Sequence, residues 1–125
     1  MTSLQPTDKP VRPFLDWPVV TDPAGWNARV ALLGIRHSEP YKHDKFPNDQ
    51  ARAPDAIRAQ SQSFCYNPGH WDFDVGTDLA SNLPTHVDMG DAAWNGGDYG
   101  DYAAAITARV RHLWKQGAQL IVLGG

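Results

Sequence analysis

The chain has 125 residues, a formal net charge of −3 and a sequence pI near 5.9, with 42% hydrophobic and 20% charged residues. This is the size and composition of one globular domain. It has no basic cluster of the kind that binds nucleic acid and no apolar run near the roughly 18 residues of a membrane span. Cys65 is the only cysteine, which excludes an internal disulfide and a cysteine cluster for zinc. The N-terminus lacks the layout of a secretory signal, so we expect a cytoplasmic protein.

Residues 1–27 are predicted to form a proline-rich N-terminal arm. Five prolines in this stretch exclude a long helix or a central strand, because proline lacks the backbone N–H that both need. The apolar pair Phe14 and Leu15 argues against a frayed terminus. We therefore expect an extended segment that wraps over a neighbouring surface, followed by a domain that covers residues 28–125.

The domain is predicted to begin with a buried strand and a helix. Residues 29–35 (RVALLGI) form a nearly continuous apolar run, which is typical of a parallel strand covered on both faces. A polar loop follows over residues 36–52. A helix then starts at Ala53 and reaches about Ser63, because Pro54 fits its first turn and Asp55 complements the helix dipole.

The next segment, residues 64–82, is rich in turn residues and contains one brief predicted edge strand at 71–76. Thr85–Met89 is predicted to be a second strand of the main sheet, closed by Gly90 and Asp91.

The clearest predicted helix covers residues 98–116. Asp98 or Asp101 is suited to cap its start, and Gly117 lies where a left-handed C-cap belongs. Its second half is basic, as the helix dipole favours, and His112 is expected on its surface. The predicted apolar stripe consists of Tyr102, Ile106, Val110, Leu113 and Trp114.

A third strand is predicted over residues 119–123 (QLIVL), followed by Gly124 and Gly125. The order strand, helix, strand, helix, strand predicts an α/β fold with a parallel sheet. A strand as apolar as this one needs neighbours, because an exposed apolar edge invites aggregation. We therefore expect that further chain follows it, or that a partner chain pairs with it.

Three segments resemble the N-terminal portion of agmatinase/arginase-type ureohydrolases. They are VALLGI at 30–35, ARAPDAIR at 51–58, and DMGD at 88–91 with the later IVLGG at 121–125. The resemblance covers residues 28–125 and implies a three-layer α/β fold of arginase type, of which this chain supplies the first strands and helices. The sequence departs from the agmatinase pattern at 34–41 (GIRHSEPY), near the mouth of the family's cleft, so another guanidino substrate, such as a small alkylguanidine, is a reasonable expectation.

The resemblance also implies a mechanism. Family members hydrolyse a guanidine or amidine carbon with a hydroxide held between two divalent metal ions, which lower the pKa of the bound water. Manganese suits the carboxylate-rich sites, and nickel is an alternative. Of the GGDH, DAHxD and DxD ligand segments, only Gly124 and Gly125 are present, so this segment alone is expected to bind no metal and to be inactive. Family oligomers imply trimers or hexamers.

Several residues are candidates for the surroundings of the active site. Asp88 and Asp91, with Gly124 and Gly125, are expected beside the site, with the two aspartates orienting loops. Arg58 is expected in a structural salt bridge. Asn48, Asp49 and Arg52 are candidates for lining the substrate entrance or a subunit contact.

Other polar groups have plainer interpretations. His37 and His43, in a loop with Asp44 and Asp49, are suited to adventitious metal binding, but a solvated loop is the preferred interpretation. Asp72 and Asp74 form a DxD, although the family's metal-binding DxD lies much later.

Two other function classes stay open. One is a non-catalytic ureohydrolase-like subunit that pairs its exposed strand with a catalytic partner chain. The other is a flavodoxin-like nucleotide-binding module, which is disfavoured because residues 34–41 contain no phosphate-binding glycine motif.

Overall fold

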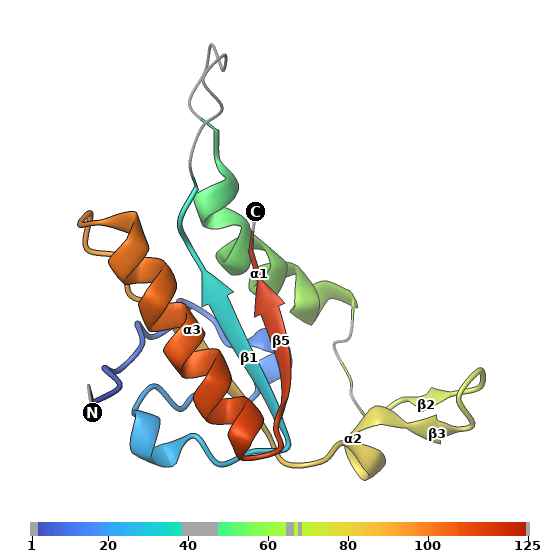
Figure 1. The fold of residues 1–125 in the computed structure, drawn as a ribbon. Coiled ribbons are helices and arrows are strands. Elements are labelled where there is room, and N and C mark those ends of the chain that lie inside the picture. Colours follow the sequence, from blue (N-terminus) through green and yellow to red (C-terminus); the bar gives the residue numbers. More distant parts are fainter. Residues whose placement is uncertain (1–2, 39–47, 65–66, 68, 125) are drawn as a thin grey trace.

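The computed structural model describes residues 3–38, 48–64, 67 and 69–124. Three parallel strands form the main sheet in the order β4-β1-β5. β1 (Val30–Ile35) lies at the centre, between β4 (His86–Ala92) and β5 (Gln119–Leu123) (Figure 1). The alternation of strands and helices confirms the α/β fold that the sequence predicts.

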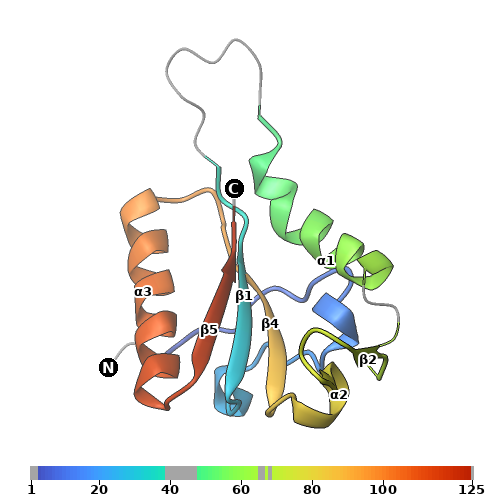
Figure 2. The same cartoon turned by 90° about the vertical axis from the view of Figure 1, so that its right-hand side faces the viewer.

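Two long helices cover opposite faces of this sheet (Figure 2). α1 (Ala53–Phe64) follows β1 and is preceded by a short 3₁₀ turn, η3 (Gln50–Arg52). α3 (Tyr99–Lys115) follows β4. None of the helices in the described ranges is long and apolar enough to cross a membrane.

The ends of α3 follow the predicted capping chemistry. The Asp98 side chain accepts a hydrogen bond from the backbone N–H of Asp101, so Asp98 is the N-cap. At the other end Gly117 has a φ of +77°, the left-handed conformation that glycine adopts without a steric penalty.

The buried face of α3 differs from the predicted apolar stripe. Leu113 and Tyr102 are buried as expected, but Trp114 is 77% exposed and Arg109 is buried instead. The Arg109 Nη2 donates to the carbonyl of Gln5 at 3.3 Å, and burial lowers the pKa of its guanidinium. Sequence alone misplaces the stripe because a long arginine stem can fill an inward position when its head reaches a backbone acceptor. His112, expected on the helix surface, is half-buried, and its ring lies against Trp26 with the centroids 6.1 Å apart.

The N-terminal arm packs along β4. The N–H of Val20 donates to the carbonyl of Asp88, and the N–H of Asp88 donates to the carbonyl of Pro18. Asp8 and Asp91 exchange a second reciprocal pair of backbone hydrogen bonds. The prolines interrupt a regular ladder, so the described part of the arm, residues 3–27, has isolated bridges to β4 and two 3₁₀ turns, η1 (Phe14–Asp16) and η2 (Pro23–Gly25).

The two tryptophans of the arm enter the core on opposite faces. Trp17 packs with Val30, Leu32 and Leu123 on the side of α1. Trp26 packs with a cluster on the side of α3, and its indole N–H donates to the carbonyl of Val20 at 3.1 Å. A buried tryptophan contributes a large apolar area, so the arm is part of the same core as the sheet.

Two local predictions need correction. The brief strand predicted at 71–76 is a hairpin of β2 (Trp71–Asp72) and β3 (Thr77–Asp78), followed by a short helix, α2 (Leu79–Asn82). β4 does not close at Gly90 but continues to Ala92, with a register shift opposite Leu32–Gly34. Gly90 has a φ of +73°, and this conformation lets the strand absorb an extra residue.

A buried ion-pair network joins α1 to β4. The guanidinium of Arg58 is fully buried and forms two hydrogen bonds with Asp88, at 2.8 and 2.9 Å, and one with Asp91, at 2.6 Å. It also donates to the carbonyl of Gly90 at 3.0 Å. Burial alone would lower the pKa of Arg58, but the hydrogen bonds and charges of the two aspartates outweigh it and raise that pKa. The salt bridge expected for Arg58 is therefore confirmed.

We expect Arg58→Met to destabilise the protein by about 3–5 kcal/mol, because it leaves two buried carboxylates without their cation. Urea unfolding followed by circular dichroism measures this loss. Arg29→Met, at an exposed arginine, is the control and is expected to cost less than about 0.5 kcal/mol. A similar cost for both substitutions would contradict a structural role for the network.

Candidate functional site at the carboxyl edge of the sheet

The connections of β1 and β4 create a topological switch point between the carboxyl ends of these two strands, and we use the word crevice for the region around it. The chain leaves β1 towards α1 on one face of the sheet and leaves β4 towards α3 on the other face (Figure 2). In open parallel sheets, ligands bind where neighbouring strands send their connections to opposite faces. The residues that follow these two strands are therefore the first candidates for a functional site.

Aromatic rings gather on the α3 side of this crevice. His37, two residues beyond β1, lies against Trp94, Tyr99 and Tyr102, with centroid distances of 4.4, 5.0 and 5.8 Å. Trp94 and Tyr102 also meet edge to face at 4.9 Å. The Nε2 atom of His37 is buried among these groups and has no hydrogen-bond partner. His37 is therefore not part of a solvated loop, which corrects that prediction.

Charged groups occupy the α1 side of the crevice. Arg36, directly after β1, pairs with Asp55 at 3.3 Å and lies 4.0 Å from Asp91. One oxygen of each carboxylate, Asp55 Oδ1 and Asp91 Oδ2, is buried without a hydrogen-bond partner. Burial raises the pKa of Asp91 despite its hydrogen bond and attraction to Arg58. This edge of the sheet thus brings buried carboxylate oxygens that lack hydrogen-bond partners close to a wall of aromatic rings.

Asp88 and Asp91, both expected beside the site, lie at different positions along β4. Asp88 is in the middle of β4, fully buried, and its Oδ2 also accepts a hydrogen bond from the N–H of Phe14 at 2.9 Å. Only Asp91 approaches the carboxyl edge. The sequence does not reveal this difference, because it depends on how far β4 extends.

Two of the predicted entrance residues, Asp49 and Arg52, line a groove. Asp49 and Arg52 form an ion pair at 3.6 Å, and Asn48 accepts hydrogen bonds from Ser38 and from the backbone of Gln50. This groove, of about 400 Å³, lies between the arm and the start of α1. Its lining residues are Val11, Arg12, Asp49, Arg52, Asp55, Ala56 and Ala59. Asp55 lines this groove and also pairs with Arg36, so the groove adjoins the crevice.

The remaining predicted positions have separate outcomes. Gly124 follows β5 at the same edge of the sheet, where an added Cβ would lie 3.9 Å from the carbonyl oxygen of Ile35. Asp72 shapes the hairpin turn, since its Oδ1 accepts from the backbone of Asp74 and Val75. Four positions named in the sequence analysis lie outside the described residues: His43, Asp44, Cys65 and Gly125.

Sequence reasoning missed the aromatic wall. Trp94 lies in the link between β4 and α3, and Tyr99 is the first residue of α3. Their only sequence signal is a pair of aromatic residues in and just after a glycine-containing segment that follows a strand. Arg36 was also missed, although it directly follows a buried strand. Among the described residues, no group of three or more His, Cys, Asp or Glu side chains is suited to hold a metal ion. These residues therefore do not fit a dimetal centre.

Comparison with known proteins agrees with this architecture. A family model described as the arginase family matches residues 28–125. A formiminoglutamase of Trypanosoma cruzi, solved with Mn²⁺, superposes with a TM-score of 0.62 at 16% identity over 84% of this chain and 34% of its own. Proclavaminate amidino hydrolase of Streptomyces clavuligerus gives 0.63 at 21% identity over 91% of this chain and 35% of its own. The chain thus spans about a third of each structure, and no curated protein sequence matches it.

Gly34→Ala is expected to destabilise the protein by about 1–3 kcal/mol, because a methyl group at this position overlaps Asp91 Oδ1 and approaches Pro54 Cβ to 3.1 Å. Thermal and urea unfolding measure the effect. Gly124→Ala is the matched control, with its nearest atom at 3.9 Å, and is expected to leave stability unchanged. An equal change in the free energy of unfolding for the two variants would show that the close approach of β1, β4 and α1 does not require a glycine at position 34.

Asp91→Asn is expected to change how stability depends on pH. Because burial raises the folded pKa of Asp91 above its ordinary 3.8, the stability due to its protonation is present below that value and is lost as pH rises through the folded pKa. Relative to Asp91→Asn, the unchanged protein should therefore become less stable as pH rises above 3.8. Urea unfolding of both proteins across this range tests the sign, and a relative gain in stability would refute it.

Proposed function

This chain belongs to the arginase family, and from that membership we propose that it forms the N-terminal part of a metal-dependent ureohydrolase. In this proposal the complete enzyme cleaves a guanidino C–N bond and releases urea or a related product. The observation that carries the proposal is the match over residues 28–125, which contain all three parallel strands and both helices that cover them.

The proposed substrate is a small guanidino compound, agmatine-like or an alkylguanidine. Support comes from the wall formed by His37, Trp94 and Tyr99 at the carboxyl edge. Aromatic faces attract a guanidinium through cation–π contacts and pack well against short alkyl groups. Asp55 Oδ1 and Asp91 Oδ2, which have no hydrogen-bond partner, add acceptors on the α1 side.

The proposed cofactor of the complete enzyme is a pair of divalent ions, manganese or nickel. Such ions supply an activated hydroxide near neutral pH. The described residues do not contain a ligand set for them, so we propose that the ligands lie outside these residues and that the 125-residue segment alone does not hydrolyse guanidino compounds. A trimeric or hexameric assembly is part of the same proposal.

A second candidate function is a non-catalytic ureohydrolase-like subunit that pairs with a catalytic chain. The edge position of β5 favours it, because Ile121 and Val122 are 41% and 46% exposed on a strand with one described neighbour. Unpaired apolar edges of this kind favour strand addition by another chain.

Both candidates are tested by metal analysis and urea release. The 125-residue chain and the same protein with any natural downstream sequence are each loaded with Mn²⁺ or Ni²⁺ and assayed with agmatine, arginine and methylated guanidines. The ureohydrolase proposal predicts two bound ions per longer chain, with urea released from at least one small guanidino compound, and neither property on the short chain.

Other outcomes separate the alternatives. Stoichiometric metal on the short chain would contradict the proposed placement of the ligands. A longer chain without metal or activity, co-purifying with a second, active ureohydrolase, would support the subunit function instead. A longer chain that binds two ions but acts on none of the guanidino compounds would refute the proposed substrate class.

A further inference from the structure

The first half of the N-terminal arm is attached mainly by hydrogen bonds. Within residues 3–16, which we call the strap, only Thr7 and Pro10 are buried, and none of the large apolar side chains is fully buried. The second half differs, because Trp17 and Trp26 lie in the core, 7% and 1% exposed. Segments with few buried apolar contacts open at a lower free energy than the core does. The strap is therefore the part of the arm that is suited to open while the rest stays in place.

A strained turn joins these two halves. Leu15 has a φ of +47° and Asp16 a φ of +57°, so two successive residues other than glycine adopt the left-handed conformation. Such strain persists only where surrounding contacts hold it. Here the N–H of Leu15 donates to the hydroxyl of Ser61 at 3.0 Å, and the side chain of Gln62 donates to Asp16 Oδ1 at 2.8 Å. Release of the strap from α1 would relieve the strain, which places a hinge at these two residues.

The strap contacts β4 next to the buried ion-pair network. The Thr7 hydroxyl donates to the carbonyl of Met89, and Asp8 and Asp91 exchange backbone hydrogen bonds of 2.8 and 2.9 Å. Gly90 permits this approach, because a Cβ at that position would overlap the carbonyl oxygen of Asp8. The strap thus lies directly on Asp91, the network residue that also approaches the carboxyl edge of the sheet.

A further contact of the strap reaches the other aspartate of the network. The N–H of Phe14 donates to Asp88 Oδ2 at 2.9 Å, and the same oxygen accepts from Arg58 at 2.8 Å. Opening of the strap would remove this donor and would admit water to a network that is otherwise buried. A buried carboxylate depends on all of its donors. The position of the strap therefore affects both aspartates, and through Asp91 it affects Arg36, 4.0 Å away at the candidate site.

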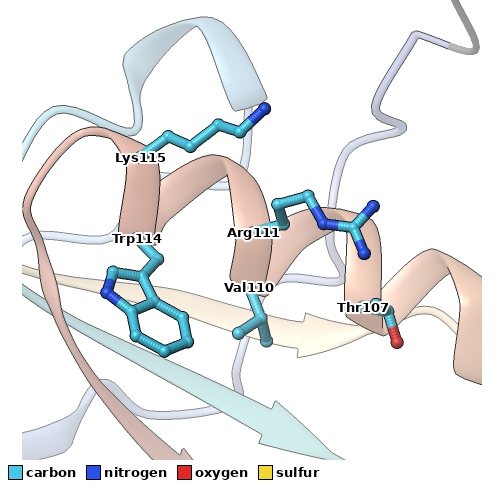
Figure 3. Close-up of a pocket in the computed structure, with 5 residues that line it drawn as sticks. All are labelled: Thr107, Val110, Arg111, Trp114 and Lys115. Carbon is cyan, nitrogen blue, oxygen red and sulfur yellow. The ribbon is translucent and has the colours of Figure 1, made fainter.

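Arg109 joins the strap to α3. Its Nη2 donates to the carbonyl of Gln5 at 3.3 Å, while its Nε is buried without a hydrogen-bond partner. Figure 3 shows Val110 and Trp114 beside a hollow on the same helix, and Arg109 is not among the residues that line this hollow. The strap thus contacts α3 apart from its exposed side. One long hydrogen bond to a neutral acceptor, beside an unused donor, is a weak attachment.

We propose that the strap opens about Leu15 and Asp16 while Trp17 stays in the core. In the closed position its hydrogen bonds hold Asp91 at the candidate site, and in the open position this part of β4 is exposed to water. A ligand that binds against Asp91 favours the closed strap, because a ligand shifts an equilibrium towards the state that it binds better. The opening itself does not depend on hydrolysis, and only the choice of ligand rests on the proposed function.

Hydrogen exchange measured by mass spectrometry on the natural full-length protein tests the opening without a ligand. The amides of Asp8 and Val20 both donate to β4, one from the strap and one from the anchored half of the arm. We expect the amides of Asp8 and Phe14 to exchange at least about tenfold faster than that of Val20, as in a segment that opens locally. Exchange from the strap as slow as that of Val20 would overturn the proposal.

Substitutions at Asp16 test the hinge. Asp16→Val is expected to increase opening of the strap about tenfold, because a β-branched residue is disfavoured in the left-handed conformation. Asp16→Asn suits this conformation and keeps an acceptor for Gln62, so it should exchange like the unchanged protein. Gln62→Ala, which removes only the hydrogen bond to Asp16, is the control, and circular dichroism verifies that each variant is folded. If Asp16→Val opened the strap no more than Gln62→Ala does, the hinge would lie elsewhere and the proposal would fail.

Guanidinium chloride, at concentrations too low to denature, tests the coupling to the site in the metal-loaded full-length protein. Calorimetry measures its binding. At ten times the dissociation constant, we expect exchange from residues 3–16 to slow about tenfold, with the amide of Val20 unchanged. Binding that leaves exchange from the strap unchanged would overturn the coupling. Absence of binding would count against the proposed substrate class, whereas the exchange of the unliganded protein would still decide whether the strap opens.

Discussion

The fold depends on one buried cation, the guanidinium of Arg58. Its hydrogen bonds to Asp88 and Asp91 join α1 to the outer strand of the sheet. Asp88 also accepts from the backbone of Phe14, so the same network holds the arm. A buried charge is stable only when its partners are correctly placed. The network therefore links helix, strand and arm at one buried point.

Asp91 connects that network to the carboxyl edge of the sheet, because it pairs with Arg58 in the core and lies 4.0 Å from Arg36 at the edge. Gly34 lets Asp91 approach β1 closely, since a side chain at this position would overlap the carboxylate. The second oxygen of Asp91 is then left facing Arg36 without a hydrogen bond. The placement of Asp91 that allows its ion pair with Arg58 thus leaves its Oδ2 atom as an acceptor near the edge where parallel sheets bind ligands. Asp91 is therefore both part of the buried network and adjacent to the candidate site.

Much of the fold follows from local chemistry. The apolar run at 30–35 predicts a central strand, Pro54 and Asp55 predict the start of α1, and Asp98 and Gly117 predict the ends of α3. Each of these signals involves residues a few positions apart, so it can be recognised in the sequence without knowledge of the tertiary structure. The resemblance to ureohydrolases likewise rests on short segments, and the family match covers the same residues, 28–125. The candidate site was harder to predict from the sequence. Asp91 was expected near it, whereas Arg36, Trp94 and Tyr99 were not.

What the sequence determined by itself was the order and type of the main elements, their caps and the family. Tertiary structure alone decided which side chains face inward and which groups meet. Arg109 replaces Trp114 on the buried face of α3 because a backbone acceptor in the arm, 104 residues earlier, satisfies its head group. His37 is half-buried because aromatic rings from the link after β4 and from the start of α3 lie against it. Such contacts join residues far apart in the chain, and no local pattern encodes them.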